Sequence, residues 1–200
     1  PELQADLTRL LREVEQFNKE YRGRLSGLII EPQASILIGV ALEKYETIQD
    51  LLGRLMSYAG LLYSADTTDP QRTKFYGDIQ EKVTNASAQL IFFQLELNRL
   101  DNASLMKVAQ LAPLSHWKPW LEDIRKEKPH ELDEKLEELF HEKYISGAAA
   151  WNRLFDETIA SLRFNISDTK LAIEPALNLM QDSDEEKRRE AAVEIGRTLK

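Results

Sequence analysis

Two of the three histidines in this 200-residue chain, His130 and His141, are followed directly by glutamate. Two His at positions i and i+4 of one helical face can hold a zinc ion, and a Glu between them can act as general base for hydrolysis. Neither segment has the second His, because Glu134 and Ile145 stand at those positions. On one continuous helix His130 and His141 would lie about 16 Å apart, whereas zinc ligand bonds are about 2 Å long. The two His are therefore not expected to share an ion.

Other residue sets for catalysis or metal binding are also incomplete. Glu137 or Glu138 can pair with His141 at helical spacing, which gives two ligands and no third. Acidic residues in such a segment are more typical of a solvated helix face. His130 is interpreted as a capping or core hydrogen-bonding residue. The chain has no Cys, no Gly-rich phosphate loop and no Gly-x-Ser-x-Gly elbow. The sequence therefore predicts no catalytic and no metal-ligating residue, and it leaves the substrate-binding residues unknown.

Composition excludes several classes of partner. The net charge is −8, so a phosphate backbone would be repelled and a nucleic-acid partner is not expected. The apolar run from Ile36 to Leu42 is far shorter than the roughly 18 residues that span a bilayer, so no membrane association is expected. The absence of Cys excludes disulfides and suits a reducing compartment, which favours a cytoplasmic location.

Helical periodicity dominates the first hundred residues. A first helix with 4-3 spacing can be closed by Gly23, and its apolar stripe is Leu3, Leu7, Leu10, Val14, Phe17 and Tyr21. A second helix starts near Pro32, with the stripe Ala34, Ile38, Ala41, Tyr45, Ile48, Leu52, Leu55, Ala59 and Leu62. A third starts at Asp69-Pro70, with the stripe Tyr76, Ile79, Val83, Ala86, Leu90, Phe93, Leu97 and Leu100. The second and third stripes match, and they predict an antiparallel helical hairpin about 45 Å long.

Shorter elements are expected after Leu100. Helices are predicted from Asp101 to about Leu111, from His116 to Lys128, over 133–144, and from a cap at Ser146 to about Leu162. In the acidic helix over 133–144, the apolar residues are expected to face inward and the acidic ones outward. The inward set is Leu132, Leu136, Leu139 and Phe140, and the outward set is Glu134, Glu137, Glu138 and Glu142.

One segment breaks the helical pattern. Apolar and polar residues alternate over 162–166 and 170–173, with Ser167-Asp168-Thr169 between them, which predicts a short β-hairpin. Glu174-Pro175 then starts a short helix, and Asp182 or Ser183 caps the last one. The fold class is therefore mainly all-α: a multi-helix array with a long antiparallel helical hairpin and one short β-hairpin near the C-terminus. We expect a long-helix subdomain at 1–112 and a second part at 113–200, packed as one continuous lobe.

Two stretches carry a family resemblance. Residues 117–132 read WKPWLEDIRKEKPHEL, and residues 175–191 read PALNLMQDSDEEKRREA. Between them come an acidic helix, a helix with Trp151 and Leu154-Phe155, and the predicted hairpin. In the order of these stretches and elements, the chain resembles the N-terminal half of the members of a family of zinc metallopeptidases that cut short peptides, oligoendopeptidase F. The specific matches lie after Trp117, and the order of elements covers nearly the whole chain.

The resemblance implies a helical lobe that forms one wall and the roof of a substrate channel. In that family the zinc ligands and the general base lie in the C-terminal half, so no site residue carries over to this sequence. The implied cofactor is zinc in the full-length protein and none in this fragment, which is expected to be inactive alone. The implied partners are the catalytic domain and short peptides.

The chain ends are interpreted as those of a cut piece. Residue 1 is Pro rather than Met, and the apolar stripe Ala192, Ile195 and Leu199 continues up to Lys200. We expect this helix and the hairpin to leave an apolar patch exposed, formed with Phe164, Ile166, Leu171 and Ile173. The competing hypothesis is a stand-alone helical protein-interaction module without catalytic activity. A reading frame that continues past Lys200 and contains His-Glu-x-x-His discriminates between the two.

Overall fold

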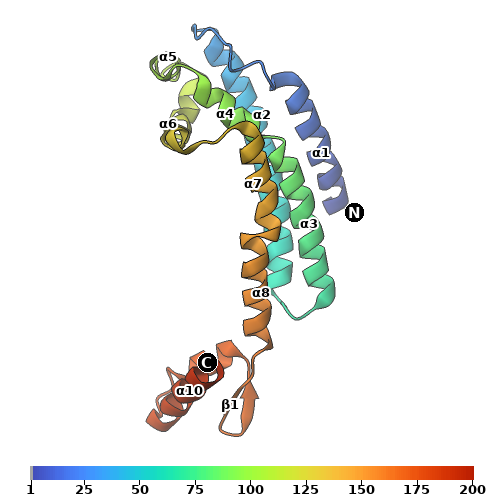
Figure 1. Cartoon of the computed structure of the whole chain (residues 1–200), viewed down its shortest axis with the longest axis vertical. Coiled ribbons are helices and arrows are strands. Elements are labelled where there is room, and N and C mark those ends of the chain that lie inside the picture. The colour runs from blue at the N-terminus through green and yellow to red at the C-terminus, as the bar shows by residue number, and fades with distance from the viewer. Residues whose placement is uncertain (1) are drawn as a thin grey trace.

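A computed structural model describes residues 2–200, and it is almost entirely helical, as the sequence predicts (Figure 1). The α-helices are α1 (Glu2–Tyr21), α2 (Ala34–Ser64), α3 (Pro70–Ala88), α4 (Ile91–Arg99), α5 (Asn102–Val108), α6 (Lys118–Glu127), α7 (Glu134–Ser146), α8 (Ala148–Ser161), α9 (Ile173–Leu179) and α10 (Glu185–Thr198). Two 3-10 turns, η1 (Leu114–Trp117) and η2 (Lys128–His130), flank α6, and β1 (Phe164–Ile166) pairs with β2 (Thr169–Leu171). None of the helices within residues 2–200 has the length and hydropathy that a membrane-spanning helix needs.

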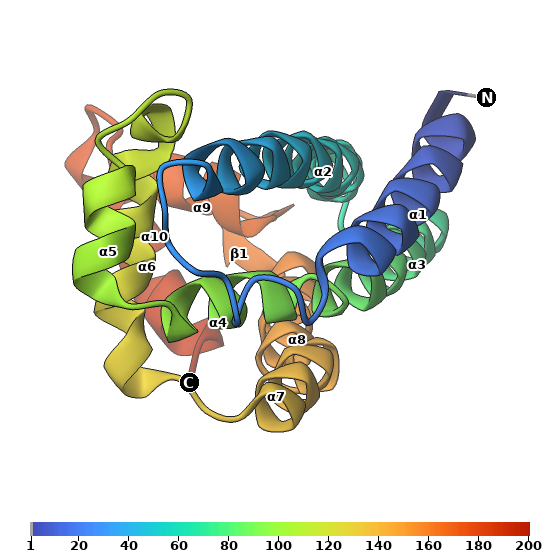
Figure 2. The same ribbon diagram turned by 90° about the horizontal axis from the view of Figure 1, so that it is seen from above.

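The molecule has a bowed outline (Figure 1). Helices α1 to α6 form a bundle. Within it, α4, α5 and α6 lie with the start of α2 at one end of the molecule, and α1, α2 and α3 run from there toward the middle. Helices α7 and α8 run one after the other beside α2 and α3, and the hairpin with α9 and α10 forms a small unit at the other end. Viewed from above, α7 and α8 overlap, so the two helices follow nearly one line (Figure 2). Gly147 joins them with φ −99° and ψ −109°. A Cβ at Gly147 would lie 3.0 Å from the Lys143 carbonyl oxygen, which is tighter than side chains normally tolerate.

The predicted helical hairpin is present and forms the main core. The stripes of α2 and α3 are largely buried, and Leu52 and Leu90 belong to the same apolar cluster. Helix α1 ends at Tyr21, and Gly23 follows with φ +76°, a left-handed conformation that favours glycine. Asp69 caps α3 by accepting from the Gln71 and Arg72 amides, with Pro70 in the first turn as expected.

The prediction of one helix from Pro70 to Leu100 is wrong, because the chain breaks between Ala88 and Ile91. In an uninterrupted helix the Gln89 carbonyl would accept from the Phe93 amide. Here the Phe93 amide donates to Leu90 at 3.0 Å, and the Asn18 side chain donates to the freed Gln89 carbonyl at 2.7 Å. The break reorients α4 so that both Phe92 and Phe93 are fully buried, and both rings lie within 6.0 Å of the Phe17 ring.

The prediction for the inward face of the acidic helix is also wrong. Leu132, Leu136, Leu139 and Phe140 are 41% to 62% exposed. Helix α7 instead packs on the bundle through polar groups: Ser87 contacts His141 Nε2 at 2.7 Å, and Arg22 pairs with Glu134 at 2.6 Å and Glu138 at 3.4 Å. These partners come from α3 and from the end of α1, so they determine which side of α7 faces the bundle.

The small C-terminal unit has a core of its own, in which Phe164, Ile166, Ala176, Ala191 and Ile195 are buried together. The expected exposed patch is therefore wrong for Phe164, Ile166 and Ile195, and Leu171 and Ile173 are partly buried against the same core. Of the side chains expected in that patch, Ala192 and Leu199 are exposed. The predicted hairpin is present, with the turn residues Ser167 and Asp168 at φ 48° and 60°, as in the turns that match strand twist.

Two helix caps also differ from the predicted ones. Helix α8 starts after Gly147 rather than Ser146, and α10 is capped by Asp184 rather than Asp182 or Ser183. The main apolar cluster continues past residue 112 to Leu121 and Ile124. Whether residues 1–112 and 113–200 behave as subdomains stays a prediction.

Candidate functional site

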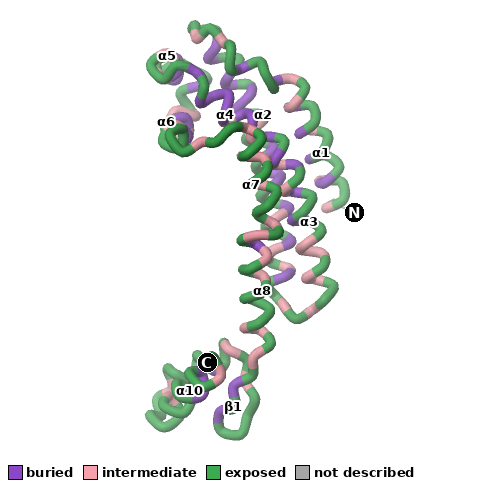
Figure 3. The backbone as a smooth tube through the Cα atoms, in the orientation of Figure 1, coloured by how far each residue is buried: buried purple, intermediate pink, exposed green. Residues whose placement is uncertain are grey.

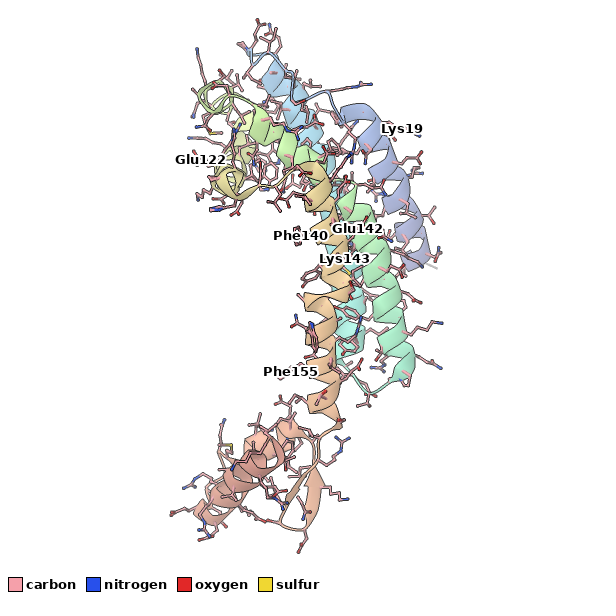
Figure 4. The ribbon with its side chains drawn as sticks, in the orientation of Figure 1. Lys19, Glu122, Phe140, Glu142, Lys143 and Phe155 are labelled. Atoms are coloured by element: carbon pink, nitrogen blue, oxygen red, sulfur yellow. The ribbon has the colours of Figure 1, made fainter. Side chains whose placement is uncertain are left out.

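The inner side of the bow carries an exposed apolar surface on α7 and α8. Seven side chains on these helices are 41% to 71% exposed, and together we call them the α7–α8 apolar face: Leu136, Leu139, Phe140, Tyr144, Trp151, Leu154 and Phe155. With about 3.6 residues per turn, these positions fall on about half of the circumference of one rod. Figure 4 shows Phe140 and Phe155 pointing to the same side of the two helices. Exposed residues dominate this part of the chain (Figure 3).

A cavity of about 460 Å³ lies beside the first turns of α7. Its apolar wall is Leu90, Ile91, Leu95 and Phe140, and Phe140 also belongs to the α7–α8 apolar face. Its polar lining is Tyr45, Gln49, Ser87, Gln94, Glu127, His130, Glu131, Glu137 and His141. The cavity and the α7–α8 apolar face are therefore continuous through Phe140, and we treat them as one candidate site.

The structure brings His130 and His141 to the same cavity. The 16 Å separation applied only to a continuous helix, and the sequence predicted two separate ones. His130 lies in η2 and α7 starts at Glu134, so the chain turns between the two His. His141 contacts Ser87, and Glu137 accepts from the Leu132 amide at 2.9 Å. His141 and Glu137 therefore have local hydrogen-bonding roles. His130 is exposed, and its side chain forms no hydrogen bond within the described part of the chain, so its interpretation as a capping or core hydrogen-bonding residue is wrong.

The segment that leads into the cavity is held by α6. Arg125 donates to the carbonyls of Leu97, Asn98 and Leu100 at 2.8 to 3.0 Å. These hydrogen bonds replace the ones that carbonyl groups at the C-terminal end of a helix such as α4 otherwise lack. Burial lowers the pKa of the Arg125 guanidinium from its usual value. The side-chain amide of Asn98 donates to the Ile124 carbonyl at 2.9 Å and to the Glu131 carboxylate. Part of the 117–132 stretch thus positions Glu131 and His130 at the cavity.

The cavity is acidic. Within residues 2–200, Glu127, Glu131 and Glu137 form no ion pair within 4.0 Å, and no Lys or Arg lines the cavity. By contrast, Glu134 and Glu138 on the same helix are paired with Arg22. Burial also raises the pKa of the Tyr45 phenol, which accepts from Gln94 at 3.3 Å. The cavity therefore favours a cation or a hydrogen-bond donor over an anion.

The residues present do not fit a zinc centre. Across the described part of the chain, no group of three or more His, Cys, Asp or Glu side chains is placed to hold a metal ion. Glu138, one of the two Glu considered as a partner for His141, pairs with Arg22 instead. That the isolated chain binds no zinc stays a prediction, tested below.

Sequence reasoning left the substrate-binding residues unknown, and it missed this cavity. Tyr45 was assigned only to a helix stripe, while Ser87 and Gln94 carried no recognisable motif. The lining comes from α2, α3, α4, α6, η2 and α7 together with Leu90 and Glu131, which lie between elements. Residues so far apart along the chain give no local spacing signal.

Comparisons with known proteins agree with this fold. Residues 96–164 match a family model described as oligopeptidase F. The crystal structure of oligoendopeptidase-F from Enterococcus faecium superposes with a TM-score of 0.77 at 18% sequence identity, over 97% of this chain and 37% of that chain. A search of curated protein sequences gave no significant match. The present chain thus spans little more than a third of the length of the matched enzyme chain. The resemblance of this chain to the helical N-terminal part of oligoendopeptidase F is thereby confirmed, by the family model over residues 96–164 and by the fold over nearly the whole chain.

Proposed function

We propose that this chain is the N-terminal lobe of a zinc-dependent oligoendopeptidase that hydrolyses internal peptide bonds of short peptides. The observation that carries the proposal is the match of nearly the whole chain to 37% of the oligoendopeptidase-F chain, supported by the family model over residues 96–164. The lobe supplies a wall of the substrate channel and no zinc ligand. Its partners are a catalytic domain and short peptides, and it binds neither nucleic acid nor membrane.

The geometry of the inner side supports a role in binding rather than in chemistry. Extended peptides present alternating side chains and unpaired backbone groups. The α7–α8 apolar face offers aromatic and aliphatic surface to side chains, and the adjacent cavity offers carboxylates, imidazoles and amides. No step of peptide hydrolysis is assigned to this chain, because residues 2–200 hold no suitable ligand set. In a zinc peptidase, the metal-bound water and a Glu base supply that chemistry.

The test starts from the reading frame. We expect it to continue past Lys200 and to encode His-Glu-x-x-His within a few hundred codons. The full-length protein should cleave a fluorogenic peptide in a chelator-sensitive reaction. A stop codon directly after Lys200 would exclude the peptidase and leave the stand-alone interaction module.

Substitutions on the inner side test the wall. In the full-length enzyme, Phe140→Ala and Phe155→Ala should raise KM several-fold with a smaller change in kcat, because they remove binding surface far from the reacting bond. Tyr58→Ala is the matched control, since Tyr58 is also an exposed aromatic, 56% accessible, but lies on α2 outside the site. An unchanged KM in both Phe variants would contradict the assignment of this surface to the substrate.

A further inference from the structure

The acidic cavity and the α7–α8 apolar face together indicate where one end of a bound peptide would lie and in which direction its chain would run. Phe140 lies in both, so the cavity sits at the α7 end of the apolar surface. From Phe140 to Phe155 the helices rise by about 22 Å at 1.5 Å per residue. An extended chain covers that distance with about seven residues at 3.3 Å each. The surface therefore has the length of a short peptide, with carboxylates at one end.

The three cavity carboxylates have unused acceptor capacity. Glu131 and Glu137 each use their Oε1 atom, for the Asn98 amide group and the Leu132 backbone amide respectively. Glu127 is exposed and has no hydrogen-bond partner among the described residues. Arg22 pairs with Glu134 and Glu138, and the charge of Arg125 acts on Glu131, so Glu127 and Glu137 carry most of the available negative charge. An ammonium group has three donors and a positive charge, so it complements this set. A carboxylate would be repelled, which excludes the C-terminal end of a peptide.

We propose that the cavity binds the N-terminal ammonium group of a short peptide, whose following residues extend along the α7–α8 apolar face toward Phe155. This inference rests on the proposed function and deepens it by naming the end of the substrate that the lobe recognises. The N-terminal ammonium is the one cation that every unmodified short peptide carries. The apolar face then favours large hydrophobic side chains in the next residues.

The inference is tested by direct binding to the 200-residue chain. The probe is an apolar heptapeptide without Lys, Arg or His, labelled at its C-terminus and followed by fluorescence anisotropy. We expect N-acetylation of the probe to weaken binding about tenfold or more, the loss typical of a charge-assisted hydrogen bond. Glu137→Gln should weaken binding of the free-amine probe by a similar factor and leave binding of the acetylated probe unchanged. Gln at position 137 keeps an oxygen for the Leu132 amide, so the local fold is retained.

Two matched variants separate the possible outcomes. Glu142→Gln makes the same change in charge at an exposed position of α7 outside the cavity (Figure 4), and it should leave both affinities unchanged. Phe140→Ala should weaken both probes. Equal binding of the free and acetylated probes, with a loss in Phe140→Ala, would overturn the ammonium site and leave the proposed peptide wall intact. Equal effects of Glu137→Gln and Glu142→Gln would also overturn it. If an acetylated probe with an internal Lys binds as tightly as the free-amine probe, the cavity binds a Lys side chain of the peptide instead of its N-terminal ammonium group. If neither probe binds, both the inference and the peptide-binding role of this surface fail.

Discussion

Replacement of Leu52 by Asp tests the central packing of the helical hairpin. Leu52 is 5% exposed on α2 and belongs to the same apolar cluster as Leu90 and Phe93. Truncation of such a buried Leu to Ala removes about 2 to 5 kcal/mol from the free energy of unfolding. An Asp at the same site adds a buried charge without a partner, which costs several kcal/mol more. The sum is comparable with the whole stability of an ordinary domain, about 5 to 15 kcal/mol.

Urea unfolding followed by circular dichroism measures the effect. We expect Leu52→Ala to lower the unfolding midpoint clearly and Leu52→Asp to leave the bundle largely unfolded without urea. Leu61→Asp is the matched control, because Leu61 lies on the same helix and is 74% exposed; its midpoint should stay close to that of the unmodified chain. If Leu52→Asp unfolds like Leu61→Asp, the stripes of α2 and α3 do not form a common core, and the hairpin architecture is refuted.

Three further predictions concern metal, pH and the second core. After dialysis the isolated chain should contain no stoichiometric zinc by metal analysis and should not cleave fluorogenic peptides; one zinc per chain, or turnover that a chelator abolishes, would show an overlooked site. Hydrogen bonds from the Ser167 amide and hydroxyl lower the pKa of Glu190 below its ordinary value of 4.5. The ionised Glu190 carboxylate therefore stabilises the hairpin fully above pH 4.5, and this stabilisation is lost as the pH falls through the pKa of Glu190 in the folded chain. Thermal melts between about pH 6 and pH 3 should show this loss, and Glu190→Gln should reduce the dependence; an unchanged pH profile would refute the role of Glu190. Ile166→Ala should increase amide hydrogen exchange over residues 162–198 and leave α2 protected, because the two cores share no residue; equal acceleration in α2 would show that the chain unfolds as one unit.

Local patterns predicted the elements that local chemistry determines. The 4-3 stripes of α1 and α2, the Asp69-Pro70 helix start and the β-hairpin all appear as expected, because periodicity, capping and turn residues act over a few residues. The break near Gln89 has no Gly or Pro to mark it. The Gln89 carbonyl that the break frees accepts a hydrogen bond from Asn18, which is 71 residues away and gives no local signal.

The orientation of α7 shows the limit of periodicity. An apolar stripe identifies one face of a helix, but it does not show what that face contacts. Contacts of Ser87 and Arg22 with the polar side of α7 determine the outcome. The candidate site could not be predicted for a related reason: its lining extends from Tyr45 to His141, and only the folded chain brings those residues together.

The direction that α8 takes from the joint at Gly147 decides how far the C-terminal unit lies from the bundle. The 14 residues of α8 make an arm about 21 Å long at 1.5 Å per residue, and the small C-terminal unit sits at its far end (Figure 1). A tilt of about 10° at the joint displaces that end by about 4 Å, which is close to the spacing of one residue in an extended chain. The Gly147 amide donates to the Lys143 carbonyl at 2.8 Å, and a Cβ at position 147 would lie 3.0 Å from the same oxygen. A larger residue there would therefore change the angle at which α8 leaves α7, and the hairpin and α10 would be displaced with it.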